Sequence, residues 1–238
     1  CLDALCVGEG DDAWVEWLLA VINNDDPNKI SNIVTRENMH RVLDNDCLNP
    51  KYMRGRKTNL DDLPFLDRGL VYDNTEFLYR YKRTIMASRG CPFHCTYCFE
   101  HQWNKMYHEV KDAGAIRQLF SVDRLLAELE DLKSCYDTRF IKFYDDIFPP
   151  FPTRKEREWH TEFCEKYPKQ IGLPFHVLIR CDLAVDLLEN HGIDILMDLK
   201  KAGMASVTMS VESGNQFIRD HVIMRDMTKG DMEKAFSR

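Results

Sequence analysis

The feature that most constrains the fold is a regular alternation of short apolar runs with amphipathic segments, which begins near Arg83. The amphipathic segments carry apolar residues at the three- and four-residue spacing of helices. The apolar runs have the length of strands, and they cover residues 84–88, 140–144, 175–180 and 206–212. Strands that alternate with helices in this way form a parallel sheet with crossover helices. The pattern therefore predicts an α/β fold for residues 83–238.

Capping residues mark the ends of the predicted helices. Ser121 precedes a helix with one leucine-rich face, and Thr153 with Glu156 has the spacing of a capping box. Gly203 ends the next predicted helix, because glycine readily takes the left-handed conformation at that position. A last helix is predicted to begin after Thr228.

The preceding part of the chain lacks this regularity. Residues 1–10 predict a short strand that ends in a glycine-rich turn. Residues 12–22 carry apolar side chains near helical spacing, and Asp11 and Asp12 suit the start of that helix. Residues 23–81 are rich in Asn, Asp, Pro and Gly, which is typical of a linker, here with one small hairpin.

Composition excludes several classes of protein. The chain has 238 residues, of which 44% are hydrophobic and 30% charged, so it can bury the core of one large domain or of one domain and part of another. With 32 Lys and Arg against 39 Asp and Glu, the net charge of −7 argues against a nucleic-acid surface. No apolar run reaches the roughly 18 residues of a membrane span, and no leader opens the chain. We therefore expect a cytoplasmic protein with no membrane span and no nucleic-acid partner.

The nine cysteines are unevenly placed. Six are scattered, as expected for small core residues that stay reduced in a cytosolic chain. Cys91, Cys95 and Cys98 instead lie within eight positions, and such a group indicates metal or redox chemistry.

Three thiolates at this spacing can surround one compact centre, and Gly90 permits a tight backbone turn beside them. A 4Fe-4S cluster that only carries electrons takes four protein ligands, so three cysteines leave one iron open to a substrate or cofactor. The alternative is a structural zinc site, which would need a fourth ligand such as His94 or His101.

The segment Ser88-Arg-Gly-Cys91-Pro-Phe-His-Cys95-Thr-Tyr-Cys98, placed after the first strand of a βα series, resembles the radical S-adenosylmethionine (SAM) superfamily. The resemblance implies that Cys91, Cys95 and Cys98 bind a 4Fe-4S cluster whose open iron is chelated by SAM, and that Tyr97 lies by the adenine. It further implies reductive cleavage of SAM to a 5′-deoxyadenosyl radical, a small-molecule substrate and an electron donor such as flavodoxin or ferredoxin. The implied fold is a partial (β/α)6 TIM-like barrel, with about four βα units present and the site at the carboxyl ends of the strands.

Five further residues match the family's SAM-binding positions. Asp145-Asp146 with Phe148 resembles an Asp-Asp-x-Phe segment that contacts the SAM amino group, and Arg180 would bind the SAM carboxylate. Ser210 and Glu212 resemble a motif near the SAM ribose. The structural alternatives are a turn or capping role for the two aspartates, and an ion pair with Asp182 for Arg180. No catalytic residue is assigned.

The N-terminal segments narrow the branch. Val7-Gly-Glu-Gly10 with its helix, and then residues 60–67, resemble the end of a Rossmann-like cobalamin-binding domain and the linker that follows it. The resemblance assigns residues 1–22 to that domain, 23–82 to the linker and 83–238 to an incomplete radical SAM core. It implies a fragment truncated at both ends, with cobalamin bound in the full-length protein. The Asp-x-His-x-x-Gly motif of many cobalamin folds is absent, as are the fifth and sixth strands.

The function implied is that of a cobalamin-dependent radical SAM methyltransferase or ring-forming enzyme. Two alternatives stay open: a cobalamin-independent radical SAM enzyme such as a methylthiotransferase, and a zinc-stabilised binding module without catalysis. Because an unclosed barrel leaves a strand edge unpaired, we expect this stretch alone to be poorly stable or to aggregate.

Overall fold

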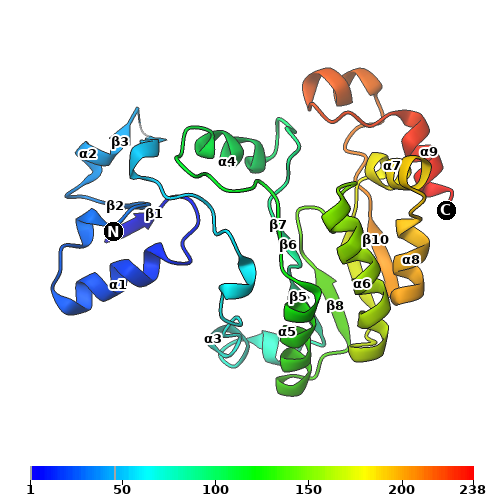
Figure 1. Cartoon of the computed structure of the whole chain (residues 1–238), viewed down its shortest axis with the longest axis horizontal. Coiled ribbons are helices and arrows are strands. Elements are labelled where there is room, and N and C mark those ends of the chain that lie inside the picture. The colour runs from blue at the N-terminus through cyan, green and yellow to red at the C-terminus, as the bar shows by residue number, and fades with distance from the viewer. Residues whose placement is uncertain (1, 46) are drawn as a thin grey trace. The chain divides into compact units, whose positions relative to one another are not determined.

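The computed structural model describes residues 2–45 and 47–238, and it divides into two compact units (Figure 1). The N-terminal unit takes the chain up to Leu63 together with Cys98–Ile116. The sheet unit takes Pro64–Tyr97 and Arg117–Arg238. Residues 98–116 thus group with the N-terminal unit, and the units do not coincide with the boundaries at 22 and 82 that the motifs indicate, so the domain assignment stays a prediction.

The sheet unit contains four parallel strands in the order β10-β9-β8-β5. Each strand lies beside the strand that follows it in this series, as crossover helices require. The predicted α/β fold with a parallel sheet is confirmed. The strands are β5 (Lys82–Ile85), β8 (Phe140–Phe143), β9 (Phe175–Leu178) and β10 (Met204–Thr208).

Helices α5, α6 and α8 run side by side along this sheet (Figure 1). The predicted caps are confirmed at three helices: Ser121 Oγ accepts from Arg124 N at the start of α5, Gly203 is left-handed with φ of 110° at the end of α8, and Thr228 and Asp231 form a capping box at the start of α9. The helices of the sheet unit are α5 (Val122–Cys135), α6 (Arg154–Gln170), α7 (Cys181–His191), α8 (Ile195–Ala202), α9 (Lys229–Phe236) and the short α3 (Gly69–Tyr72).

Three local expectations need correction. The capping box of α6 is only half formed, since Thr153 accepts from Glu156 N but the Glu156 carboxylate accepts from Phe151 N at 2.8 Å. The strand expected at 206–212 covers Met204–Thr208 instead, and Glu212, beyond its end, takes a left-handed φ of 64° that a strand does not contain. Helix α7 was not anticipated from the sequence, although its residues pack into the core.

An aromatic cluster forms the centre of the core in the sheet unit. Phe163 of α6 packs edge-on against Phe143 and Phe175 of two strands, at centroid distances of 5.8 and 5.9 Å. Trp159 stacks on Phe163 at 5.2 Å. Because aromatic side chains bury large apolar areas, this cluster ties α6 to the sheet.

The N-terminal unit holds small antiparallel ladders. Strand β1 (Ala4–Cys6) pairs with β2 (Ile33–Thr35), and β3 (Leu43–Asp44) pairs with β4 (Cys47–Leu48). The predicted first strand and small hairpin are confirmed. Its helices are α1 (Ala13–Asn23), α2 (Met39–Val42) and α4 (Phe99–Tyr107).

Helix α1 has the predicted position but not the predicted cap. Asp12 makes no capping hydrogen bond, and its carboxylate instead accepts from Lys57 Nζ at 3.1 Å. The apolar side chains of α1 are largely exposed, with Leu18 at 50% and Ile22 at 71%.

Short elements complete the described chain. The ladder of β6 (Ser88–Arg89) with β7 (Gln118–Leu119) lies in the sheet unit. The single turns are η1 (Pro27–Lys29), η2 (Pro50–Tyr52), η3 (Leu60–Asp62), η4 (Glu76–Tyr79) and the π turn η5 (Ile218–Val222). No helix in the described ranges is both long enough and apolar enough to cross a membrane.

Candidate functional site at the carboxyl ends of the strands

The cysteine segment begins directly after β5 and the short strand β6. Pairing of Ser88 with Leu119 and of Arg89 with Gln118 fastens the start of this segment. Gly90 then takes a left-handed φ of 83°, which a side chain would strain. Cys91 and Cys95 are 9% and 6% exposed. The sequence therefore places two buried thiols in the loop that follows the first parallel strand.

Asp145 and Asp146 hold the backbone that leads into this loop. The buried Asp145 carboxylate accepts from Ala87 N at 3.1 Å and from Ser88 Oγ at 2.5 Å. Burial raises the pKa of Asp145 to about 6, against the lowering effect of these hydrogen bonds. Burial also raises the pKa of Asp146, which accepts from the Gly90 backbone. Both aspartates thus position the cysteine loop, and their contact with a SAM amino group stays a prediction.

Arg180 follows β9 and is 2% exposed. Its guanidinium donates to both carboxylate oxygens of Asp182, at 3.0 and 2.7 Å, so the ion pair considered from the sequence is present. Its Nη1 lies 3.9 Å from Cys95 Sγ, and the guanidinium carbon lies 3.7 Å from the centre of the Phe93 ring. Burial would lower the pKa of Arg180, but Asp182 and the charge on Cys95 raise it. The side chain therefore remains a cation beside the thiol.

Arg225 is a second buried cation at the same sulfur, and it was missed in the sequence because no motif surrounds it. It is 7% exposed, and its Nη1 lies 3.9 Å from Cys95 Sγ and 3.1 Å from the Tyr97 hydroxyl. Its Nη2 donates to the Ser210 carbonyl at 2.9 Å. Its buried Nε has no partner among the residues that the structure describes. Chain order gave no indication of this role, because 130 positions separate Arg225 from Cys95.

Tyr97, Ser210 and Glu212 gather around Arg225. Glu212 Oε1 lies 4.0 Å from Arg225 Nη1, and the Tyr97 hydroxyl is hydrogen-bonded to Glu212. Burial, with Cys95 and Glu212 nearby, raises the pKa of Tyr97 to about 12, although Arg225 opposes this. Tyr97 therefore keeps its proton at neutral pH. The Ser210 contact comes from its backbone carbonyl rather than from its hydroxyl.

The chemistry of the donor set fits a thiolate-bound cluster. Two buried thiols lie in one loop, and two guanidinium groups lie at hydrogen-bonding distance from Cys95 Sγ, as partners of an iron-bound sulfur would. The described cysteines form no disulfide. Within residues 2–45 and 47–238, however, no three side chains of His, Cys, Asp or Glu converge as a formed metal site. Cys98 belongs to the N-terminal unit, so the three-cysteine ligand set stays a prediction.

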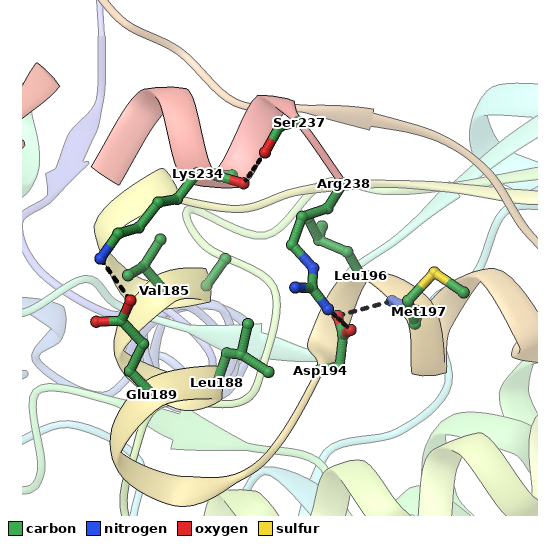
Figure 2. Close-up of a pocket in the computed structure, with 11 residues that line it drawn as sticks. Val185, Leu188, Glu189, Asp194, Leu196, Met197, Lys234, Ser237 and Arg238 are labelled. Atoms are coloured by element: carbon green, nitrogen blue, oxygen red, sulfur yellow. Dashed lines mark hydrogen bonds and ion pairs between the residues drawn. The ribbon is translucent and has the colours of Figure 1, made fainter. Parts of the chain in front are cut away.

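A cavity of about 650 Å³ lies elsewhere in the sheet unit, among α7, α8 and the C-terminal end of α9 (Figure 2). Leu188 and Leu196 contribute apolar walls, and Lys234 pairs with Glu189 at its rim. None of the nine residues predicted from the sequence lines this cavity. The cavity is therefore separate from the site that the sequence predicts.

Comparison with known sequences gives a distant relative. No protein-family profile matches the chain. An uncharacterized methyltransferase from Pyrococcus horikoshii is 27% identical over 155 residues, which are 62% of this chain and 29% of that protein. The chain therefore spans less than a third of the relative's length.

Comparison of structures covers nearly the whole chain. The cobalamin-dependent SAM radical enzyme OxsB, with aqua-cobalamin and SAM bound, superimposes with a TM-score of 0.69 at 19% identity. The match covers 98% of this chain and 31% of OxsB. The radical SAM methyltransferase TsrM from Kitasatospora setae matches with a TM-score of 0.67 at 14% identity, over 99% of this chain and 43% of TsrM. The chain thus shares the fold of the matching parts of OxsB and TsrM, and it accounts for less than half of the length of either protein.

Proposed function

We propose that this chain is part of a cobalamin-dependent radical SAM methyltransferase. One observation carries the proposal: residues that follow the second, third and fourth parallel strands contact the segment 87–97, which follows the first strand and holds Cys91 and Cys95. Asp145 after β8 binds the start of the cysteine loop, Arg180 after β9 contacts Cys95, and Arg225 links Cys95 to the segment after β10. Active sites of βα folds lie at this edge of the sheet.

In this proposal Cys91, Cys95 and Cys98 hold the 4Fe-4S cluster. When bound, the cluster supplies the electron that cleaves SAM. The two arginines donate to Cys95 Sγ and so orient this ligand. The Glu212 carboxylate provides an acceptor for the adenosyl group of SAM, and Tyr97, whose hydroxyl is bonded to Glu212, and Ser210 lie beside it.

The comparisons and one feature of the N-terminal unit support cobalamin-dependent methyl transfer over methylthiolation or ring formation. The distant relative and TsrM are both methyltransferases by name, and the OxsB structure contains cobalamin. The exposed apolar side chains of α1 also suit a helix that packs against a larger domain. We propose that residues 1–22 belong to that domain, that 23–82 are the linker, and that the sheet is part of a barrel.

The experiment is anaerobic reconstitution of the complete protein with iron, sulfide and hydroxocobalamin, followed by dithionite and SAM. We expect the visible absorption of a thiolate-bound cluster, SAM-derived 5′-deoxyadenosine and methylcobalamin. The Cys95→Ala variant is expected to lose the cluster and at least about 100-fold of the 5′-deoxyadenosine yield. Cys135→Ala, which alters an exposed cysteine outside the loop, serves as the matched control.

Other outcomes separate the alternatives. A cluster with 5′-deoxyadenosine but no cobalamin retained would favour a cobalamin-independent enzyme such as a methylthiotransferase. A colourless protein that holds zinc, with Cys95→Ala indistinguishable from the parent in SAM cleavage, would refute the radical chemistry.

A further inference from the structure

We propose that Arg180 and Arg225 jointly raise the reduction potential of the cluster through a single ligand, Cys95. This inference rests on the proposed function, because it concerns the cluster that the cysteines would hold. In this proposal Arg225, which lies in no sequence motif, acts on the cluster through Cys95 and is a positioning residue.

The geometry is specific to one sulfur. Both Nη1 atoms lie 3.9 Å from Cys95 Sγ, and the two arginines come from separate elements, at the start of α7 and after η5. Both side chains are almost fully buried. In such surroundings a cation interacts with a neighbouring charge far more strongly than it does in water.

The charges around the two arginines differ. Arg180 shares its charge with the bidentate carboxylate of Asp182. Arg225 donates to the neutral Tyr97 hydroxyl and Ser210 carbonyl, and its nearest carboxylate, Glu212, lies 4.0 Å away. Less of the Arg225 charge is compensated, so Arg225 is expected to have the larger effect on Cys95.

The sign follows from elementary electrostatics. Reduction adds one electron to a cluster that already carries thiolate charge, and nearby cations stabilise the added charge. Hydrogen bonds to cluster sulfurs act in the same direction and are a recognised control of cluster potentials. Removal of Arg225 should therefore make the cluster harder to reduce.

The test is a redox titration of the reconstituted complete protein without SAM, in which electron paramagnetic resonance measures the reduced cluster. For Arg225→Gln we expect the ratio of reduced to oxidised cluster at a fixed poise to fall about tenfold, which is about 59 mV for one electron. Arg180→Gln should shift the ratio in the same direction but less. Arg225→Lys, which retains the charge, should restore most of the parent value.

Two controls complete the design. Arg154→Gln removes the same charge from an exposed pair with Glu158 and should leave the potential unchanged. Asp182→Asn removes the carboxylate that compensates Arg180 and should shift the ratio toward reduced cluster by about threefold. This opposite shift still tests the proposal if Arg225→Gln does not bind a cluster.

The outcomes are separable. Loaded Arg225→Gln and Asp182→Asn variants with the parent's midpoint would overturn the role of the arginines while the proposed function stands. Failure of the parent protein to assemble any cluster would refute the proposed function itself.

Discussion

Helices with the same apolar spacing are buried in the sheet unit but exposed in the N-terminal unit. In α6 of the sheet unit, aromatic residues at helical spacing are buried against the strands, and Phe163 is fully buried. In α1 of the N-terminal unit, apolar residues at similar spacing are exposed, and only Ala13 and Ala20 are buried. Periodicity predicts that a helix has an apolar face, but burial of that face requires a partner surface.

The largest expected effect concerns α6, the helix whose apolar face is buried. Phe163→Ala should lower the free energy of unfolding by about 3–5 kcal/mol, because it opens a cavity between α6 and the sheet. Urea titration followed by fluorescence measures the loss, since Trp159 stacks on Phe163. Phe236→Ala, at an exposed side chain, should change it by less than about 0.5 kcal/mol. Equal losses in the two variants would contradict the assigned core.

The next effect concerns Asp145, which holds the cysteine loop. Its pKa in the folded protein, about 6, lies above the ordinary value of 3.8, so its protonated form favours folding. This contribution, on the order of 3 kcal/mol, is fully present below about pH 4 and is lost as the pH rises through about 6. Asp145→Asn should lack this decline. Urea titrations at pH 4 and 7 measure the free energy of unfolding of the parent and of Asp145→Asn, both without cluster. If both proteins lose the same amount of stability between these pH values, the buried Asp145 carboxylate is not the cause of the decline.

The exposed face of α1 gives a prediction of intermediate size. If a larger domain covers α1, Leu18→Ala should cost about 2 kcal/mol in the complete protein, although the described residues leave Leu18 half exposed. Hydrogen exchange should also show α1 amides protected in that protein. If Leu18→Ala lowers the free energy of unfolding by less than about 0.5 kcal/mol and the α1 amides exchange fast, this face of α1 is exposed to solvent in the complete protein as well. The difference between the two units would then not be due to a missing domain.

The smallest expected effect lies inside the N-terminal unit. The buried Tyr107 hydroxyl accepts from Glu9 N at 2.9 Å and joins α4 to the turn after β1. Tyr107→Phe removes one partly buried hydrogen bond and should cost about 1 kcal/mol. The Glu9 amide should then exchange faster, while amides of the sheet remain as in the parent. Unchanged exchange at Glu9 would show that this bond does not support the unit.

Much of the candidate site could be predicted from the sequence, because short-range patterns place its residues at the ends of strands. Asp145, Arg180 and Ser210 each follow a strand, and the carboxyl ends of parallel strands lie at one edge, so their convergence could be expected before any contact was known. The partners could not be predicted. Ser88 and Ala87 bind Asp145, and Arg225 reaches Cys95, through separations of 57 to 130 positions that no local pattern encodes.

The sequence alone defines the alternation of strands and helices, most helix caps and the cysteine spacing, because periodicity, capping and ligand spacing operate within a few residues. Only the tertiary structure decides that residues 98–116 join the N-terminal unit, that the face of α1 is exposed, and that two arginines meet at one sulfur. These outcomes depend on contacts between segments that are far apart in the sequence. They also depend on the cost of burying a charged side chain, which must find a hydrogen-bonding or charged partner.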